Sequence, residues 1–161
     1  MEEVVNKSIQ VIGFTRNADF QLPVLNTNKE FLQENIILLR VGCQHEEFLN
    51  VLQEVRAEDI MLVDLDRVAL PMLNALGQAY GKTERKDHIY YVSSRKRKLW
   101  LGFVDAVLWR GDRSITDSPV LIGNKSLFMK AYAGNDLDGN LLRAVSYSLQ
   151  KAFVKFGTLE V

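Results

Sequence analysis

Short apolar runs alternate along this chain with longer stretches in which apolar residues recur every three or four positions. Short runs rich in β-branched residues indicate buried strands, and the longer spacing indicates helices that bury one face. The expected strands are 8–15, 36–41, 59–64, 89–93 and 126–132, and the expected helices are 29–34, 45–55, 68–80 and 138–156. This alternation predicts a three-layer α/β domain, with a mainly parallel central sheet between two layers of helices.

The segment 99–109 is apolar at nearly every position, so its periodicity fits a buried strand as well as a helix. Its tryptophans, Trp100 and Trp109, fit either a core or a protein interface, because interface centres are enriched in aromatic residues and arginine. We expect residues 95–113 and the last helix to form a homodimer contact or a docking face for a missing output domain.

The composition is that of one ordinary globular domain. The chain has 161 residues, of which 47% are hydrophobic and 25% charged, and a single cysteine, Cys43, excludes an internal disulfide. No apolar run approaches the roughly 18 residues of a membrane span, and the Met-Glu-Glu start lacks the positive charge of a signal peptide. We expect a cytoplasmic protein without membrane contact.

The last five residues, 157–161, follow the expected end of the last helix. Their sequence, Gly-Thr-Leu-Glu-Val, resembles a cloning-site dipeptide followed by the start of a cleavable-tag linker. We therefore predict that the domain spans residues 1–156 and that 157–161 is a vector-derived tail outside the fold.

Charge is distributed unevenly along the chain, although the formal net charge is zero. Acids predominate from residue 30 to 66, and bases predominate from 82 to 98. One basic run, flanked by Tyr90, Tyr91 and the two tryptophans, consists of Arg95, Lys96, Arg97 and Lys98. Such a run fits a surface for nucleic acid or a nucleotide, where cations bind phosphates and rings stack on bases. It also fits a solvated turn, and the zero net charge favours the turn.

Two aspartates lie at the end of the expected strand 59–64: Asp64 is its last residue, and Asp66 follows two positions later. Open α/β sheets place their sites at the carboxyl ends of parallel strands, which favours a functional site here. Aspartate after a strand is also a frequent helix cap or turn residue, so a structural role stays open. The two histidines, His45 and His88, lack companions at metal-ligand spacing, and we expect no metal site.

Three stretches, 58–77, 88–94 and 126–153, resemble the CheY-like receiver domains of two-component signalling. On this resemblance Asp64 stands at the phospho-acceptor position, Ser93 or Ser94 at the position of the switch hydroxyl, and Lys130 at that of the strand-end lysine. The resemblance implies a flavodoxin/CheY-like sheet. It also implies a signalling cycle in which a divalent cation shields a phosphorylated aspartate, and a hydroxyl and a lysine bind the phosphoryl group.

The sequence departs from the receiver pattern in two places. The acidic pair that should follow the first strand is replaced by a stretch containing Arg16, which would repel a magnesium ion and is a candidate partner for Asp64. The segment between Ser94 and Lys130 is also longer than in the family. We therefore expect a degenerate receiver: a regulatory module that is not an enzyme, needs no cofactor and acts through protein contact. The alternative is the nucleic-acid-binding or nucleotide-binding module that uses residues 95–98.

Overall fold

A six-stranded sheet forms the centre of the computed structural model, which describes residues 9–17, 19, 36–39, 44–83, 87–92, 115, 117–131 and 141–159. The strands stand in the order β2-β1-β3-β5-β4-β6. They are β1 (Ile9–Phe14), β2 (Ile36–Leu38), β3 (Asp59–Asp64), β4 (His88–Tyr91), β5 (Val120–Asn124) and β6 (Lys155–Thr158). The predicted α/β architecture with a central sheet is confirmed.

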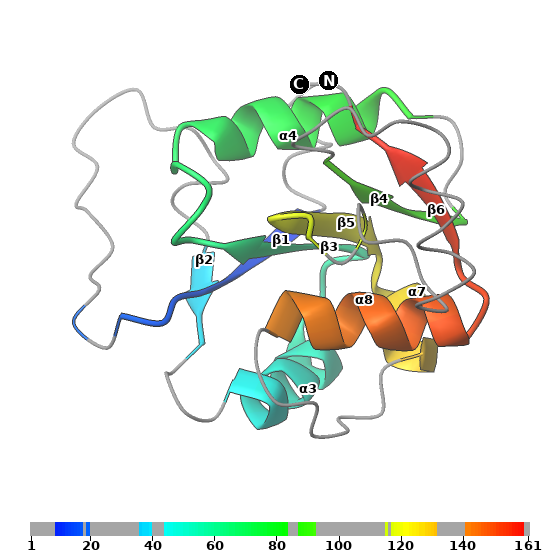
Figure 1. Ribbon diagram of the computed structural model, residues 1–161, viewed down its shortest axis with the longest axis horizontal. Helices are drawn as coiled ribbons and strands as arrows, with labels where there is room; N and C mark the ends of the chain where they lie inside the picture. Colours follow the sequence, from blue (N-terminus) through cyan, green and yellow to red (C-terminus); the bar gives the residue numbers. More distant parts are fainter. Residues whose placement is uncertain are drawn as a thin grey trace.

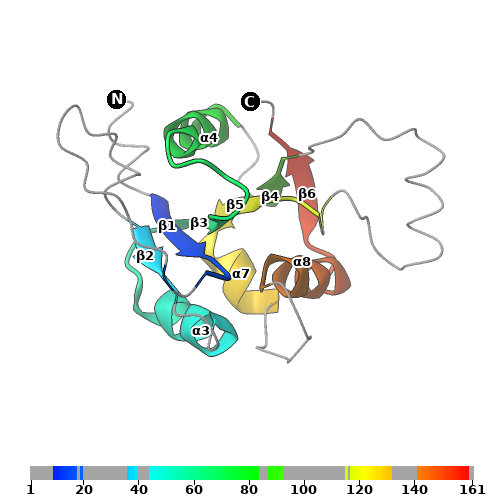
Figure 2. The same ribbon diagram turned by 60° about the vertical axis from the view of Figure 1, so that its left-hand side comes forward.

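Helices cover both faces of this sheet. They are α3 (Gln44–Glu54), α4 (Met72–Gly81), α7 (Lys125–Ala131) and α8 (Leu141–Lys151). Helix α4 lies on one face, and α3, α7 and α8 share the other (Figure 1). After rotation of the view, α7 is seen between α3 and α8 (Figure 2).

The sheet is mixed because one of its described strands runs against the others. Strand β1 is parallel to β2 and β3, and β4 is parallel to β6. Strand β5 lies between β3 and β4 and is antiparallel to both. The chain leaves β4 and enters β5 at the same edge of the sheet, and a connection of that kind joins antiparallel neighbours.

The region around residue 126 differs from the prediction. The expected strand 126–132 is wrong, because the strand lies earlier, in β5, and residues Lys125–Ala131 form α7. Asn124 caps this helix: its Oδ1 accepts hydrogen bonds from the Ser126 amide at 2.9 Å and the Ser126 hydroxyl at 2.6 Å. The periodicity of a short apolar run does not distinguish a strand from a helix. Here the Asn124 cap marks the start of a helix.

The end of the chain also differs from the prediction. Helix α8 ends at Lys151 and closes in a Schellman turn, in which the Phe153 amide bonds Gln150 O and the Val154 amide bonds Leu149 O, both at 3.1 Å. The chain then enters β6 beside β4. Leu159 is buried, and its amide donates to Tyr91 O at 2.9 Å. The expectation that the fold excludes everything after residue 156 is therefore wrong for 157–159.

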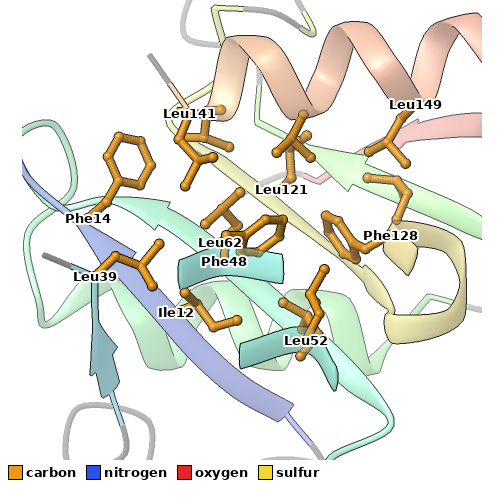
Figure 3. Close-up of a cluster of buried hydrophobic side chains, with 14 residues drawn as sticks. Ile12, Phe14, Leu39, Phe48, Leu52, Leu62, Leu121, Phe128, Leu141 and Leu149 are labelled. Atoms are coloured by element: carbon orange, nitrogen blue, oxygen red, sulfur yellow. The ribbon is translucent and has the colours of Figure 1, made fainter. Parts of the chain in front are cut away.

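Two hydrophobic cores lie on the two faces of the sheet, because successive residues of a strand point to opposite sides. In β3, Ile60 and Leu62 belong to the core beneath α3, α7 and α8, and Met61 and Val63 to the core beneath α4. Figure 3 shows the first core, where Phe48 of α3 and Phe128 of α7 meet edge to face with ring centroids 6.2 Å apart. These cores hold the strand ends in fixed positions. Among the described residues, no helix is long and apolar enough to span a membrane.

Candidate functional site

The carboxyl ends of β1 and β3 lie side by side and bring the candidate residues together. The two strands are parallel and in register from Ile9 opposite Asp59 to Phe14 opposite Asp64. Residues directly after Phe14 and Asp64 therefore meet at one edge of the sheet, which is where α/β folds place their sites. The prediction of this location rested on the apolar run of β3 and its acidic end.

Asp64 is buried and heads the turn that leaves β3. Its Oδ1 accepts the Asp66 amide at 3.0 Å, and its backbone oxygen accepts the amides of Arg67 and Val68 at 3.1 and 3.0 Å. Its Oδ2 lies 3.3 Å from Nε of Arg67, with the carboxylate only 6% exposed and the arginine 44% exposed. The structure thus shows the turn-forming role that was open from the sequence, together with a resident cation at the carboxylate.

Asp66 ties the segment after β1 to the turn after β3. Its Oδ1 accepts the hydroxyl of buried Thr15 at 2.5 Å, and its Oδ2 accepts the Arg16 amide at 2.9 Å. The Thr15 hydrogen bond, followed by the Arg16 amide and the Arg16 charge, lowers the pKa of this carboxyl below its usual value. Asp66 is therefore held as a carboxylate that joins the two strand ends.

The arginine that pairs with Asp64 is not the one that the sequence suggested. From the sequence Arg16 was one candidate partner for Asp64, but its described contact is with Asp66, through the backbone amide. The ion pair of Asp64 is made by Arg67, three residues later in the same turn. Sequence reasoning missed Arg67 and Thr15. The available signals were the three-residue spacing from Asp64 and a hydroxyl directly after a buried strand.

Strand β5 separates Asp64 from the end of β4. Neighbouring strands lie about 4.8 Å apart, so the end of β4 is roughly 10 Å from that of β3. Ser93 and Ser94, which follow β4 in the sequence, lie outside the described residues. Beside Asp64 the structure places Pro119, whose carbonyl accepts the Asp64 amide at 2.9 Å. This arrangement differs from the adjacent strands that the receiver resemblance implied.

Lys130 does not occupy a strand end. It belongs to α7, and the first residue of that helix, Lys125, donates its amide to Glu58 O at 2.8 Å, next to the start of β3. The helix therefore begins at the edge opposite Asp64. The expected strand-end position of Lys130 is wrong because β5 runs in the reverse direction; its side chain lies outside the described part of the structure.

Ser118 is a buried hydroxyl at the site edge that sequence reasoning missed. Its Oγ donates to Val120 O at 2.6 Å and accepts the Val92 amide at 3.1 Å. It therefore fastens the end of β4 to the start of β5. Both hydrogen bonds join the Ser118 hydroxyl to backbone atoms of the chain, so we assign Ser118 a structural role.

The basic run Arg95, Lys96, Arg97 and Lys98 lies outside the described residues, as do Trp100 and Trp109. The flanking Tyr90 and Tyr91 belong to the described residues, and the ring of each packs against other aromatic rings. The Tyr90 ring meets the rings of Tyr80 and His88, with centroids 5.7 and 6.1 Å away. The Tyr91 ring meets that of Phe156 at 6.5 Å. These contacts weaken the expectation that the two tyrosines stack on bases.

No group of three or more His, Cys, Asp or Glu residues is placed to hold a metal ion within the described part of the chain. At the strand ends, Asp64 and Asp66 supply two carboxylates, and both accept hydrogen bonds from their surroundings. In comparisons with known proteins, no family model, no curated protein and no solved structure matches this chain.

Proposed function

We propose that this chain is a receiver-type regulatory module that acts through a protein partner or an output domain, without magnesium-dependent phosphorylation of Asp64. The main support is the ion pair between Asp64 and Arg67. In the receiver scheme a divalent cation shields the acceptor carboxylate. A resident guanidinium at 3.3 Å supplies part of that charge and competes with a cation for the carboxylate.

The topology supports the receiver-type framework. With β5 left out, the strand order is β2-β1-β3-β4-β6, and these strands share one direction. A flavodoxin-like sheet has the order 2-1-3-4-5 with all strands parallel. We therefore interpret β5 as an antiparallel strand inserted into such a sheet. The insertion separates the end of β3 from that of β4, which favours the loss of a phosphorylation cycle.

The first test is incubation of the protein with acetyl phosphate and magnesium, followed by intact mass measurement. We expect no gain of a phosphate, because Arg67 occupies the carboxylate and the acids that would bind the cation are missing. Efficient gain of one phosphate that Asp64→Asn abolishes would show that the module does undergo the phosphorylation cycle.

The second test rebuilds the missing features. Thr15→Asp combined with Arg67→Ser supplies an acid after β1 and removes the resident cation. We expect saturable magnesium-dependent shifts of amide resonances near the strand ends. The matched control is Thr15→Asn with Arg67→Ser, which loses the same contacts but adds no charge. If the two double variants respond equally to magnesium, the receiver-type assignment loses its support.

The competing proposal, a nucleic-acid-binding or nucleotide-binding module, rests on the sequence of residues 95–98. Binding of RNA or DNA that weakens with salt and disappears when all four bases are replaced by glutamine would favour it. The wild-type chain in the same titration at low salt is the reference.

A further inference from the structure

The outward side of α3 is an acidic stripe. Glu46, Asn50 and Glu54 are exposed and stand four residues apart, so their side chains line up along one face of the helix. The helix contains no lysine or arginine. Its opposite side buries Phe48 and Leu52 in the core. The acidic stripe therefore faces away from the sheet.

The outward side of α8 is a basic stripe with the same spacing. Arg143 and Lys151 are exposed, and half-buried Tyr147 stands midway between them, with Lys151 Nζ 4.7 Å from the centre of its ring. The helix contains no aspartate or glutamate. Arg143 also lies 3.7 Å from Asp117, but both partners are more than half exposed, so that pair is weak.

Two exposed apolar side chains belong to α7 and to the turn that follows α8. Helix α7, which lies between α3 and α8 (Figure 2), exposes 45% of Met129. Just beyond α8, Phe153 is 91% exposed and has a φ of 60°. Glycine is the residue that takes this left-handed conformation without steric cost. An exposed aromatic ring at such a position is a candidate contact for a second chain.

We propose that two copies of this chain pair through the layer of α3, α7 and α8, with α8 of each copy against α3 of the other. The cations of α8 and the acids of α3 are each eight residues apart, about 12 Å along a helix. Each pair flanks a central polar residue, Tyr147 or Asn50, so the charges match whether the helices run parallel or antiparallel. A two-fold axis along α7 forms this contact twice and places Met129 near its counterpart.

Charge reversal tests the pairing. Arg143→Glu with Lys151→Glu makes both helices of that variant acidic, and Glu46→Lys with Glu54→Lys makes both helices of the second variant basic. We expect each variant alone to dimerise roughly tenfold or more weakly than wild type in sedimentation velocity. An equimolar mixture is expected to form a one-to-one heterodimer, because both contacts then join opposite charges. This recovery in the mixture also shows that the separate variants are folded.

A matched pair of methionines locates the interface. Met129→Ser is expected to weaken dimerisation, and Met72→Ser is expected to leave it unchanged, because Met72 is 43% exposed on α4, across the sheet. A wild-type chain that stays monomeric at its highest soluble concentration would overturn the proposal. So would a dimer that neither charge reversal weakens, or a mixture that does not associate. The pairing does not depend on the receiver-type function, so its failure leaves that proposal unchanged.

Discussion

Thr15 and Asp66 are 51 positions apart in the sequence, yet the Thr15 hydroxyl donates a 2.5 Å hydrogen bond to Asp66 Oδ1. This bond crosses from the segment after β1 to the turn after β3. The Arg16 amide reinforces it by donating to the second carboxylate oxygen. The two strand ends are thereby held together by protein groups, in the place where the receiver scheme would have a bound cation join them.

Replacing Asp66 by Asn is expected to lower the free energy of unfolding at pH 7 by less than about 1 kcal/mol, since the residue is exposed. The pKa of Asp66 is lowered in the folded state, chiefly by the Thr15 hydrogen bond. Its contribution to stability is therefore present above the ordinary aspartate pKa, near 3.9, and is lost as the pH falls through the lowered value. Urea unfolding of wild type and variant across this range measures the difference. A difference that does not change with pH would contradict the assignment.

Replacing Arg67 by Ala is expected to cost about 1 kcal/mol of unfolding free energy, because the buried Asp64 carboxylate loses its cation while solvent screens the exposed arginine. The double variant, Arg67→Ala with Asp64→Asn, should lose less unfolding free energy than the sum of the losses in the two single variants. Chemical unfolding of the four proteins in this cycle gives the coupling energy. Arg56→Ala, at an exposed arginine after α3, is the control and should change stability by less than about 0.5 kcal/mol. Strict additivity would show that the ion pair does not contribute.

Strongly periodic or fully apolar segments were sufficient to predict several elements of the fold. Strand β3 is apolar from Ile60 to Val63 and α3 carries a clear apolar face, so both were placed within one residue. The apolar face of α8 gave the start of that helix within three residues, but the expected end was five residues too late. Strand β6 was missed because its residues are exposed or only half-buried at an edge of the described sheet. Its direction and neighbour depend on the turn at Phe153, which no periodic pattern encodes.

The position of the candidate site was more predictable than its contacts. Asp64 could be located because it ends a buried strand, and parallel neighbours bring their ends to one edge. Its partner Arg67 depends on the turn conformation, and the place of Lys130 depends on the direction of β5. That direction follows from tertiary pairing with β3 and β4. The receiver resemblance therefore assigned Lys130 to a strand end, whereas it lies in α7.

Replacing Phe153 by Gly is expected to stabilise the protein by about 0.5–1 kcal/mol, because glycine adopts the left-handed conformation of this residue without a steric cost. The exposed ring provides no compensating burial within the chain. Thermal unfolding at a concentration where the protein is monomeric measures the change. Phe153→Ala removes the ring but keeps the unfavourable conformation, so it should give no gain. Equal stabilisation by both changes would attribute the effect to the ring.

Deleting residues 157–161 is expected to lower the free energy of unfolding by at least about 2 kcal/mol, since Leu159 is a buried leucine whose full burial is worth roughly that amount. The deletion also removes half of β6 and the bond from the Leu159 amide to Tyr91 O. Gly157 is fitted to its neighbour as well, because a Cβ there would lie 2.6 Å from the Tyr90 ring.

Deleting only residues 160 and 161 is the control for this truncation, and it should have little effect if the cost comes from β6 and Leu159. Leu159→Ala separates the two contributions, because it removes most of the apolar burial and retains the strand and its backbone bond to Tyr91. Urea unfolding should then rank wild type and the two-residue deletion above Leu159→Ala, and Leu159→Ala above the five-residue deletion. A five-residue deletion as stable as wild type would mean that β4 keeps its place without the second half of β6.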